Sequence, residues 1–264
     1  MADTVLFERR TEHTALLTFN RPERLNALDR ASLARLHQVL VDLAGQPAIR
    51  AVVLTGTGRA FSAGADLKEM STTTAADRSV REAHRELHLF QDLTRRMVEL
   101  PTIFVAAING IAVGVGAELA IAADVRIGTD TTALLLSEAK RGLFQTNGVL
   151  HFLPRIVGHG RAAQWLLTAE QVDAVRLLEA GFLTELAPAD ALLDRAFVVA
   201  ETIAGNAPIS VRLIKKLLHR TWDVDLESML QYEIDGMMAC MASDDIAEGV
   251  RAFVEKRPPR WQGR

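Results

Sequence analysis

At 264 residues the chain is long enough for one large domain with a sizeable core, or for a main domain with a helical appendage. A formal net charge of −3, with 30 basic residues against 33 acidic ones and no basic stripe, argues against a nucleic-acid partner, while the single cysteine, Cys240, excludes an intrachain disulfide and a multi-cysteine metal site. We find no secretory signal pattern and no run of about 18 apolar residues, so we expect a cytoplasmic protein with no membrane partner and no bound metal.

The first hundred residues alternate between strand and helix patterns. Residues 5–9 and 14–19 predict two short strands, and Asp29 is a good N-cap for a helix that continues to Gly45. A fully buried type of strand is predicted at 51–55, followed by a loop of small residues. An amphipathic helix is predicted at 81–100, because apolar residues recur there at helical spacing among many charges.

The centre of the sequence is an apolar strand pattern at 102–108, then a turn containing Gly114 and Gly116, then a small-residue helix with Glu118 in its first turn. Glycines allow the backbone to approach a ligand closely, and a helix N-terminus presents unpaired N–H groups to a negatively charged oxygen. The segment 61–66 has the same design. If the strands before these two loops lie in one sheet, two backbone N–H groups converge and form an oxyanion hole.

Two glutamates are the candidate acids. Glu118 lies beside the glycine turn, and Glu138 follows an apolar strand pattern at 132–136, where burial would raise its affinity for a proton. Paired acids suit the addition or removal of water, because one takes a proton while the other gives one. A packing turn and a solvated acid before Lys140 and Arg141 explain the same residues, so the pattern alone leaves both interpretations open.

Beyond Gly142 the sequence is mostly helical. Helical patterns cover residues 149–157, 161–168, 172–180, 189–205, 209–221, 226–242 and 245–256. Methionines around Cys240 indicate an apolar helix face, so this cysteine is predicted to be a core residue.

Several collinear segments resemble the enoyl-CoA hydratase/isomerase (crotonase) family. They are Asn20-Arg21-Pro22, Leu25-Asn26-Ala27-Leu28, Leu54-Thr55-Gly56, Phe61-Ser62-Ala63-Gly64-Ala65-Asp66-Leu67-Lys68-Glu69-Met70, Ala107-Ile108-Asn109-Gly110 through Glu118-Leu119-Ala120, and Phe253-Val254-Glu255-Lys256-Arg257. The resemblance covers nearly the whole chain. It implies an α/β fold, a crotonase (ClpP-like) superhelix of ββα turns over residues 1–200, followed by a helical trimerisation region over residues 201–264. It also implies a homotrimer or a dimer of trimers.

The resemblance further implies a site for an acyl-CoA thioester. The thioester oxygen would accept hydrogen bonds from the backbone N–H groups of Ala65 and Val115. The residues implied to line the path of CoA and the thioester are Arg24, Leu25, Ala63, Gly64, Asp66, Leu67, Lys68, Gly142 and Lys256, the last of these reaching the CoA phosphates of a neighbouring subunit. No separate cofactor is implied, because coenzyme A is part of the substrate.

Glu118 and Glu138 fall where the hydratases of this family keep both acids, so the resemblance implies an enoyl-CoA hydratase. In that chemistry Glu118 takes the proton of a water that attacks C3, and Glu138 protonates C2. The sequence departs from the hydratase pattern at Val115, at Leu136-Ser137 and at Gln145-Thr146-Asn147-Gly148, a stretch that partly frames the water in hydratases. The alternatives are a delta isomerase or another crotonase-type enzyme that uses Glu138, and a non-catalytic acyl-CoA-binding homologue.

Overall fold

The larger of two sheets is built mainly from parallel strands. The computed structural model describes residues 3–66, 69 and 80–264, and within them this sheet has six strands in the order β1-β2-β3-β5-β7-β10. The strands are β1 (Val5–Arg9), β2 (Thr14–Phe19), β3 (Ala51–Gly56), β5 (Ile103–Ile108), β7 (Val125–Gly128) and β10 (Glu185–Leu186). Among the described residues of this sheet only the β1–β2 pair is antiparallel, and the remaining neighbours are parallel.

A second, smaller sheet runs beside the first. Among the described residues it has four strands in the order β4-β6-β8-β9. They are β4 (Ala60–Ser62), β6 (Ile111–Val113), β8 (Ala133–Leu135) and β9 (Gln171–Asp173). Each of β4, β6 and β8 follows a strand of the larger sheet after a short turn, so β3-β4, β5-β6 and β7-β8 are successive pairs. A helix follows each pair in turn, which is the ββα superhelix that the family resemblance implied.

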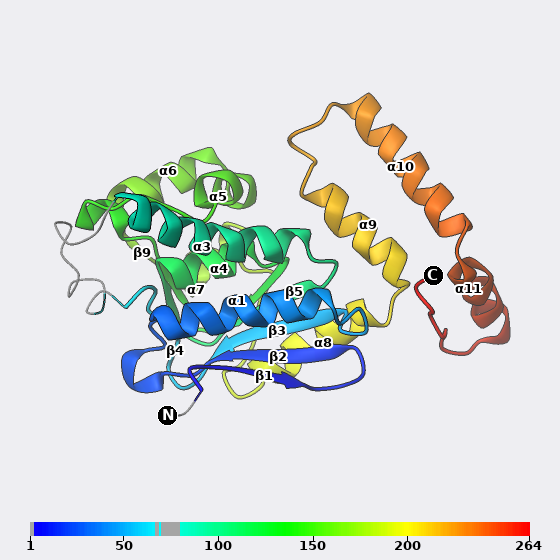
Figure 1. Ribbon diagram of the computed structural model, residues 1–264, viewed down its shortest axis with the longest axis horizontal. Helices are drawn as coiled ribbons and strands as arrows, with labels where there is room; N and C mark the ends of the chain where they lie inside the picture. The colour runs from blue at the N-terminus through cyan, green and yellow to red at the C-terminus, as the bar shows by residue number, and fades with distance from the viewer. Residues whose placement is uncertain (1–2, 67–68, 70–79) are drawn as a thin grey trace.

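Helices cover both faces of the larger sheet (Figure 1). The elements before residue 205 are η1 (Pro22–Arg24), α1 (Arg30–Ala44), α3 (Val80–Glu99), α4 (Val115–Ala122), η2 (Glu138–Arg141), α5 (Val149–Val157), α6 (His159–Thr168), α7 (Ala174–Glu179) and α8 (Leu192–Ala204). Along β5, Phe104 packs in the main core while Val105 packs against the residues that α8 buries. Strands buried on both faces have continuous apolar sequences, which explains the fully buried strand predicted at 51–55 and the apolar strand pattern at 102–108.

The helix α4 is buried along its whole length. Half of its eight residues are glycine or alanine, which lets neighbouring elements approach closely. Gly116 shows this directly, since a Cβ atom placed there would lie 2.6 Å from Cβ of Ser62 on β4. The N-terminus of α4 is therefore held firmly against the smaller sheet, and this contact positions the candidate site.

Three helices at the C-terminal end extend away from the sheets in Figure 1: α9 (Pro208–Leu218), α10 (Leu226–Met241) and α11 (Asp244–Glu255). Lys215 anchors α9 to the body, because its Nζ lies 3.0 Å from Oδ2 of Asp124 and donates hydrogen bonds to the carbonyl oxygens of Met97 in α3 and of Thr102, just before β5. The prediction that Cys240 is a core residue was wrong. It is half-buried, and the methionines beside it are about 60% exposed in the protomer.

The strands and helices agree with the sequence patterns in most places. The bounds of β1, β2 and α5 are those predicted, and Asp29 caps α1 by accepting the N–H of Ser32. The segment 56–65 was predicted as a loop, but it contains the buried strand β4, and residues 171–173 form β9 where a helix was expected to begin. Strands of three residues carry too little pattern to be found without their partners. The division at residue 200 stays a prediction.

Within the described residues, no single helix has the length and apolar composition needed to cross a bilayer, although the bent pair α8 and α9 meets the criterion together.

Candidate active site

The two glycine-containing loops lie side by side because β4 and β6 are parallel neighbours in the smaller sheet. Each loop turns through a glycine in the left-handed region, Gly64 with φ 84° and Gly114 with φ 47°. A Cβ atom on Gly64 would lie 2.6 Å from the carbonyl oxygen of Val113, so only glycine fits there. The sequence prediction that the two loops meet is confirmed.

The residues that follow these glycines carry the candidate oxyanion donors. Val115 is the first residue of α4, so its N–H has no partner within the helix. Around Ala65, the N–H of Leu28 donates to Gly64 and the N–H of Asp66 donates to Leu28, which directs the Ala65 N–H to the other side. In the described part of the chain, no hydrogen bond is made by either of these two N–H groups.

Glu118 is buried on α4, with 1% of its surface exposed. The backbone N–H of Thr146 donates to its Oε1 at 3.2 Å, and the Thr146 hydroxyl donates to Oε2 at 3.4 Å. Burial is the main cause that raises the pKa of Glu118 to about 7, and the nearby charge of Glu138 adds to it, while the N–H groups of Thr146 and Asn147 oppose it. Glu118 can therefore either hold or release a proton near neutral pH.

Glu138 begins the short helix η2 and is half-buried. The side-chain amide of Gln145 donates to its Oε2 at 3.0 Å. Its other oxygen, Oε1, faces the glycine turn, since a Cβ atom on Gly114 would lie 3.0 Å from it. The carboxylate is thus packed directly against the turn that presents the N–H of Val115.

A cavity of about 380 Å³ joins these groups. Seven of the predicted site residues line it: Ala63, Gly64, Ala65, Val115, Glu118, Glu138 and Gly142. Apolar side chains, Leu87 and Phe90 of α3 together with Phe144, complete the wall, and Arg141 supplies a positive charge. The cavity has the mixed character of a small-molecule site, mostly apolar with a few convergent polar groups.

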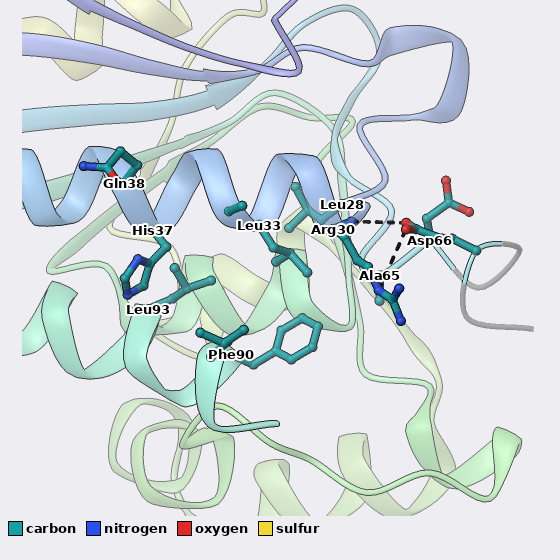
Figure 2. A pocket seen from close by; sticks show the side chains of 12 residues that line it. Leu28, Arg30, Leu33, His37, Gln38, Ala65, Asp66, Phe90 and Leu93 are labelled. Atoms are coloured by element: carbon teal, nitrogen blue, oxygen red, sulfur yellow. Dashed lines mark hydrogen bonds and ion pairs between the residues drawn. The ribbon is translucent and has the colours of Figure 1, made fainter. Parts of the chain in front are cut away.

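A second cavity of about 440 Å³ lies between α1 and α3 and is drawn in Figure 2. Leu33, Phe90 and Leu93 face it, and His37 lies at one end. It shares Ala65 and Phe90 with the first cavity, so the two meet at one of the candidate oxyanion donors. Asp66 lines this second cavity and not the first.

The remaining predicted site residues lie at different distances from the cavity that contains Glu118 and Glu138. The carbonyl of Leu25 accepts the N–H of Ala63 at 2.8 Å, so Leu25 borders the loop, and Arg24 is exposed beside it. Lys256 is the C-cap residue that follows α11, a helix that lies in Figure 1 on the opposite side of the molecule from β4, so Lys256 does not line the cavity of its own protomer. Leu67 and Lys68 lie outside the described residues.

No individual role was predicted for Gln145, Thr146 or Phe90. The four residues from Gln145 to Gly148 were recognised as a departure from the family pattern, which was the one available signal. That signal could not assign the partners, because Glu118 lies 28 residues from Thr146 and the fold of the loop after Glu138, which brings Gln145 back to this acid seven residues away, has no pattern in the sequence. Phe90 looked like any apolar position of an amphipathic helix.

The family is shown by similarity to known proteins. The family model described as enoyl-CoA hydratase/isomerase matches residues 9–264. YngF of Bacillus subtilis is 37% identical over 265 residues, with 100% of both chains covered, and the short-chain-enoyl-CoA hydratase of Clostridium acetobutylicum is 32% identical, with 92% of both covered. The crystal structure of an enoyl-CoA hydratase from Bacillus anthracis matches with a TM-score of 0.92 at 34% identity, covering 99% of this chain and 100% of that one.

The architecture is therefore that of a crotonase-fold enzyme. The chain belongs to the enoyl-CoA hydratase/isomerase family, whose substrates are acyl-CoA thioesters.

Proposed function

We propose that this protein is an enoyl-CoA hydratase, which adds water syn across the 2,3 double bond of a 2-enoyl-CoA. One observation carries the proposal. Glu118 and Glu138 line the same cavity as Ala65 and Val115, whose N–H groups are unpaired in the described chain. The reaction needs an electrophile activated at the thioester, a base for water and an acid for C2, and this cavity contains a candidate for each.

The thioester oxygen is the group that the two N–H donors would hold. When water adds to C3, the electrons of the double bond move toward the carbonyl, and negative charge develops on that oxygen. Fixed N–H donors stabilise the charge as it forms, and each such donor is worth about 2.7–4 kcal/mol where it has been measured. Val115 in place of a glycine leaves its backbone donor intact and adds a side chain to the cavity wall.

The two glutamates divide the proton transfers. Glu118 takes a proton from water as the water oxygen bonds to C3, which its pKa of about 7 allows near neutral pH. Glu138 delivers a proton to C2 from Oε1, the oxygen beside Gly114, and the enolate collapses back to the thioester. The substrate has then gained one water, and exchange with solvent returns both carboxyl groups to their starting states. No cofactor is required beyond the CoA that the substrate carries.

Hydration of crotonyl-CoA, followed by the loss of conjugated absorbance, tests the proposal. We expect Glu118→Gln and Glu138→Gln each to slow hydration by roughly 10²–10⁴-fold, the usual contribution of a positioned acid or base. Hydration that survives Glu118→Gln would contradict the proposal. A double-bond shift that depends on Glu138 but not on Glu118 would identify an isomerase, and binding of acyl-CoA thioesters without turnover would identify a non-catalytic homologue.

We also propose that the protomers assemble as a homotrimer or a dimer of trimers. The support is the apolar surface of α10, where Ile234, Met237 and Met238 are 57–60% exposed, because apolar patches of this kind mark association sites. A light-scattering mass equal to one protomer would contradict it. The cytoplasmic location stays a prediction.

A further inference from the structure

We propose that Gln145 is a positioning residue for Glu138. Its side-chain amide holds Oε2 of the Glu138 carboxylate, so that Oε1 faces the reacting carbon of the substrate. This inference rests on the proposed hydratase function and goes beyond it, because it assigns a role to a residue at which the sequence departs from the family pattern.

The contact itself has a defined direction. Nε2 of Gln145 donates to Oε2 of Glu138 at 3.0 Å. A carboxylate only accepts hydrogen bonds, so the opposite orientation of the amide would place its oxygen against a negative charge. Oε2 of Glu138 accepts this hydrogen bond both when the group is ionised and when Oε1 carries the proton that goes to C2, so the amide determines which oxygen of Glu138 is occupied.

The other end of the amide argues against a purely structural role. Oε1 of Gln145 is buried and has no hydrogen-bond partner among the described residues. An unpaired buried oxygen is unfavourable, and an apolar side chain of the same length would fill the space without that cost. The hydrogen bond from Gln145 to Glu138 is therefore the interaction that favours a glutamine at this position.

The same short segment also holds the other acid. Gln145 contacts Glu138 through its side chain, and the next residue, Thr146, contacts Glu118 through its N–H and its hydroxyl. Two consecutive residues thus bridge two acids that come from different elements, α4 and η2. The segment therefore sets the position of one carboxylate relative to the other.

Exchange at C2 isolates the proton transfer that Gln145 would control. With a saturated acyl-CoA such as butyryl-CoA, Glu138 takes a proton from C2, the electron pair moves to the thioester oxygen, and an enolate forms. In D₂O the carboxyl group exchanges its proton with solvent and returns a deuteron to C2. No water attacks C3, so the base role of Glu118 is not used.

The variant Gln145→Met keeps the length of the side chain and removes both polar atoms, while Gln145→Glu keeps the shape and replaces the donor by an acceptor. We expect Gln145→Met to slow deuterium incorporation at C2 and kcat for crotonyl-CoA by roughly ten- to a hundredfold, as a misplaced reacting group does, with little change in KM. We expect Gln145→Glu to be slower still. Gln164→Met is the matched control, because Gln164 donates to Glu170 at 2.8 Å on an exposed surface, and it should leave both rates unchanged.

Thermal unfolding and the Kd for butyryl-CoA accompany the rates. Gln145→Met removes an unpaired buried oxygen but also the donor to Oε2 of the half-buried Glu138, so we expect its melting temperature to stay close to that of the wild type. A purely structural role of Gln145 predicts a clear fall in melting temperature instead. Wild-type exchange and hydration in Gln145→Met would overturn this inference and leave the proposed function standing. A wild-type protein that neither hydrates crotonyl-CoA nor exchanges C2 would overturn both. If Gln145→Met does not fold, equal exchange in Gln145→Glu and the wild type overturns the inference by itself.

Discussion

Replacing Glu118 by glutamine should raise the stability of the protein while it removes activity. The carboxyl group is buried on α4 with 1% of its surface exposed, and its pKa is raised from an ordinary 4.5 to about 7, mainly by that burial. Ionisation of this buried group therefore lowers the stability of the folded protein. Glutamine has nearly the same shape, carries no charge at any pH and can still accept the N–H of Thr146.

The size and sign of the effect follow from the difference between the two pKa values. Because the folded state binds the proton more tightly than the unfolded chain, full stability is present below about pH 4.5 and is lost as the pH rises to about 7, beyond which the loss is constant. One pKa unit corresponds to about 1.36 kcal/mol, so the loss approaches roughly 3 kcal/mol. The glutamine variant lacks this loss.

Urea unfolding of the wild type and of Glu118→Gln, at one fixed protomer concentration, measures the effect. At about pH 8 the variant should be more stable by roughly 3 kcal/mol, and near pH 4.5 the two proteins should differ by less than about 1 kcal/mol. Glu179→Gln is the control, because Glu179 is an exposed residue at the end of α7 and its replacement removes a charge without uncovering a buried one. The reasoning fails if the difference between variant and wild type is the same at both pH values, or if the variant is the less stable protein at about pH 8.

Three other substitutions test separate parts of the structure. Val115→Pro removes the proposed oxyanion N–H at the first position of α4, where proline is tolerated, and should lower kcat for crotonyl-CoA by roughly 10²–10³-fold with a small change in melting temperature; wild-type kcat would exclude this donor. Lys215→Met leaves the carboxylate of Asp124 without its closest cation and should lower the free energy of unfolding in urea by about 3–5 kcal/mol, whereas a loss below about 1 kcal/mol would show that the pair does not anchor α9. Met237→Glu places a charge on the exposed apolar surface of α10 and should shift the light-scattering mass toward that of one protomer; an unchanged mass would place the interface elsewhere.

The glycine loops illustrate how far local pattern reaches. Gly64 and Gly114 were recognised as turns because small residues followed apolar strands, and both adopt positive φ angles in the structure. The strands β4 and β6, which actually hold the loops together, were not recognised. With three residues each, they depend on pairing with one another and carry no periodicity of their own.

For the two acids, too, the sequence pattern predicted the residues but not their surroundings. Glu118 and Glu138 were selected as a pair from their positions after a glycine turn and a strand, and from the family resemblance. Their environments differ in a way the sequence did not predict: Glu118 is almost fully buried, whereas Glu138 is half-buried and held by Gln145. Burial depends on every element that packs around a residue, so it has no local signature.

The alternation of strands and helices, the two glycine turns and the candidate acids could all be predicted from the amino-acid sequence alone. They depend on short-range periodicity, backbone freedom and residue chemistry. The folded structure was needed to show that both turns and both acids line one cavity, that Thr146 and Gln145 bind one acid each, and that the apolar side of α10 is exposed in the protomer. Most of these properties arise from contacts between segments distant in the chain, and the contact between Gln145 and Glu138 depends on how the loop between them folds against the rest of the molecule, so none of them follows from the neighbours of a single residue.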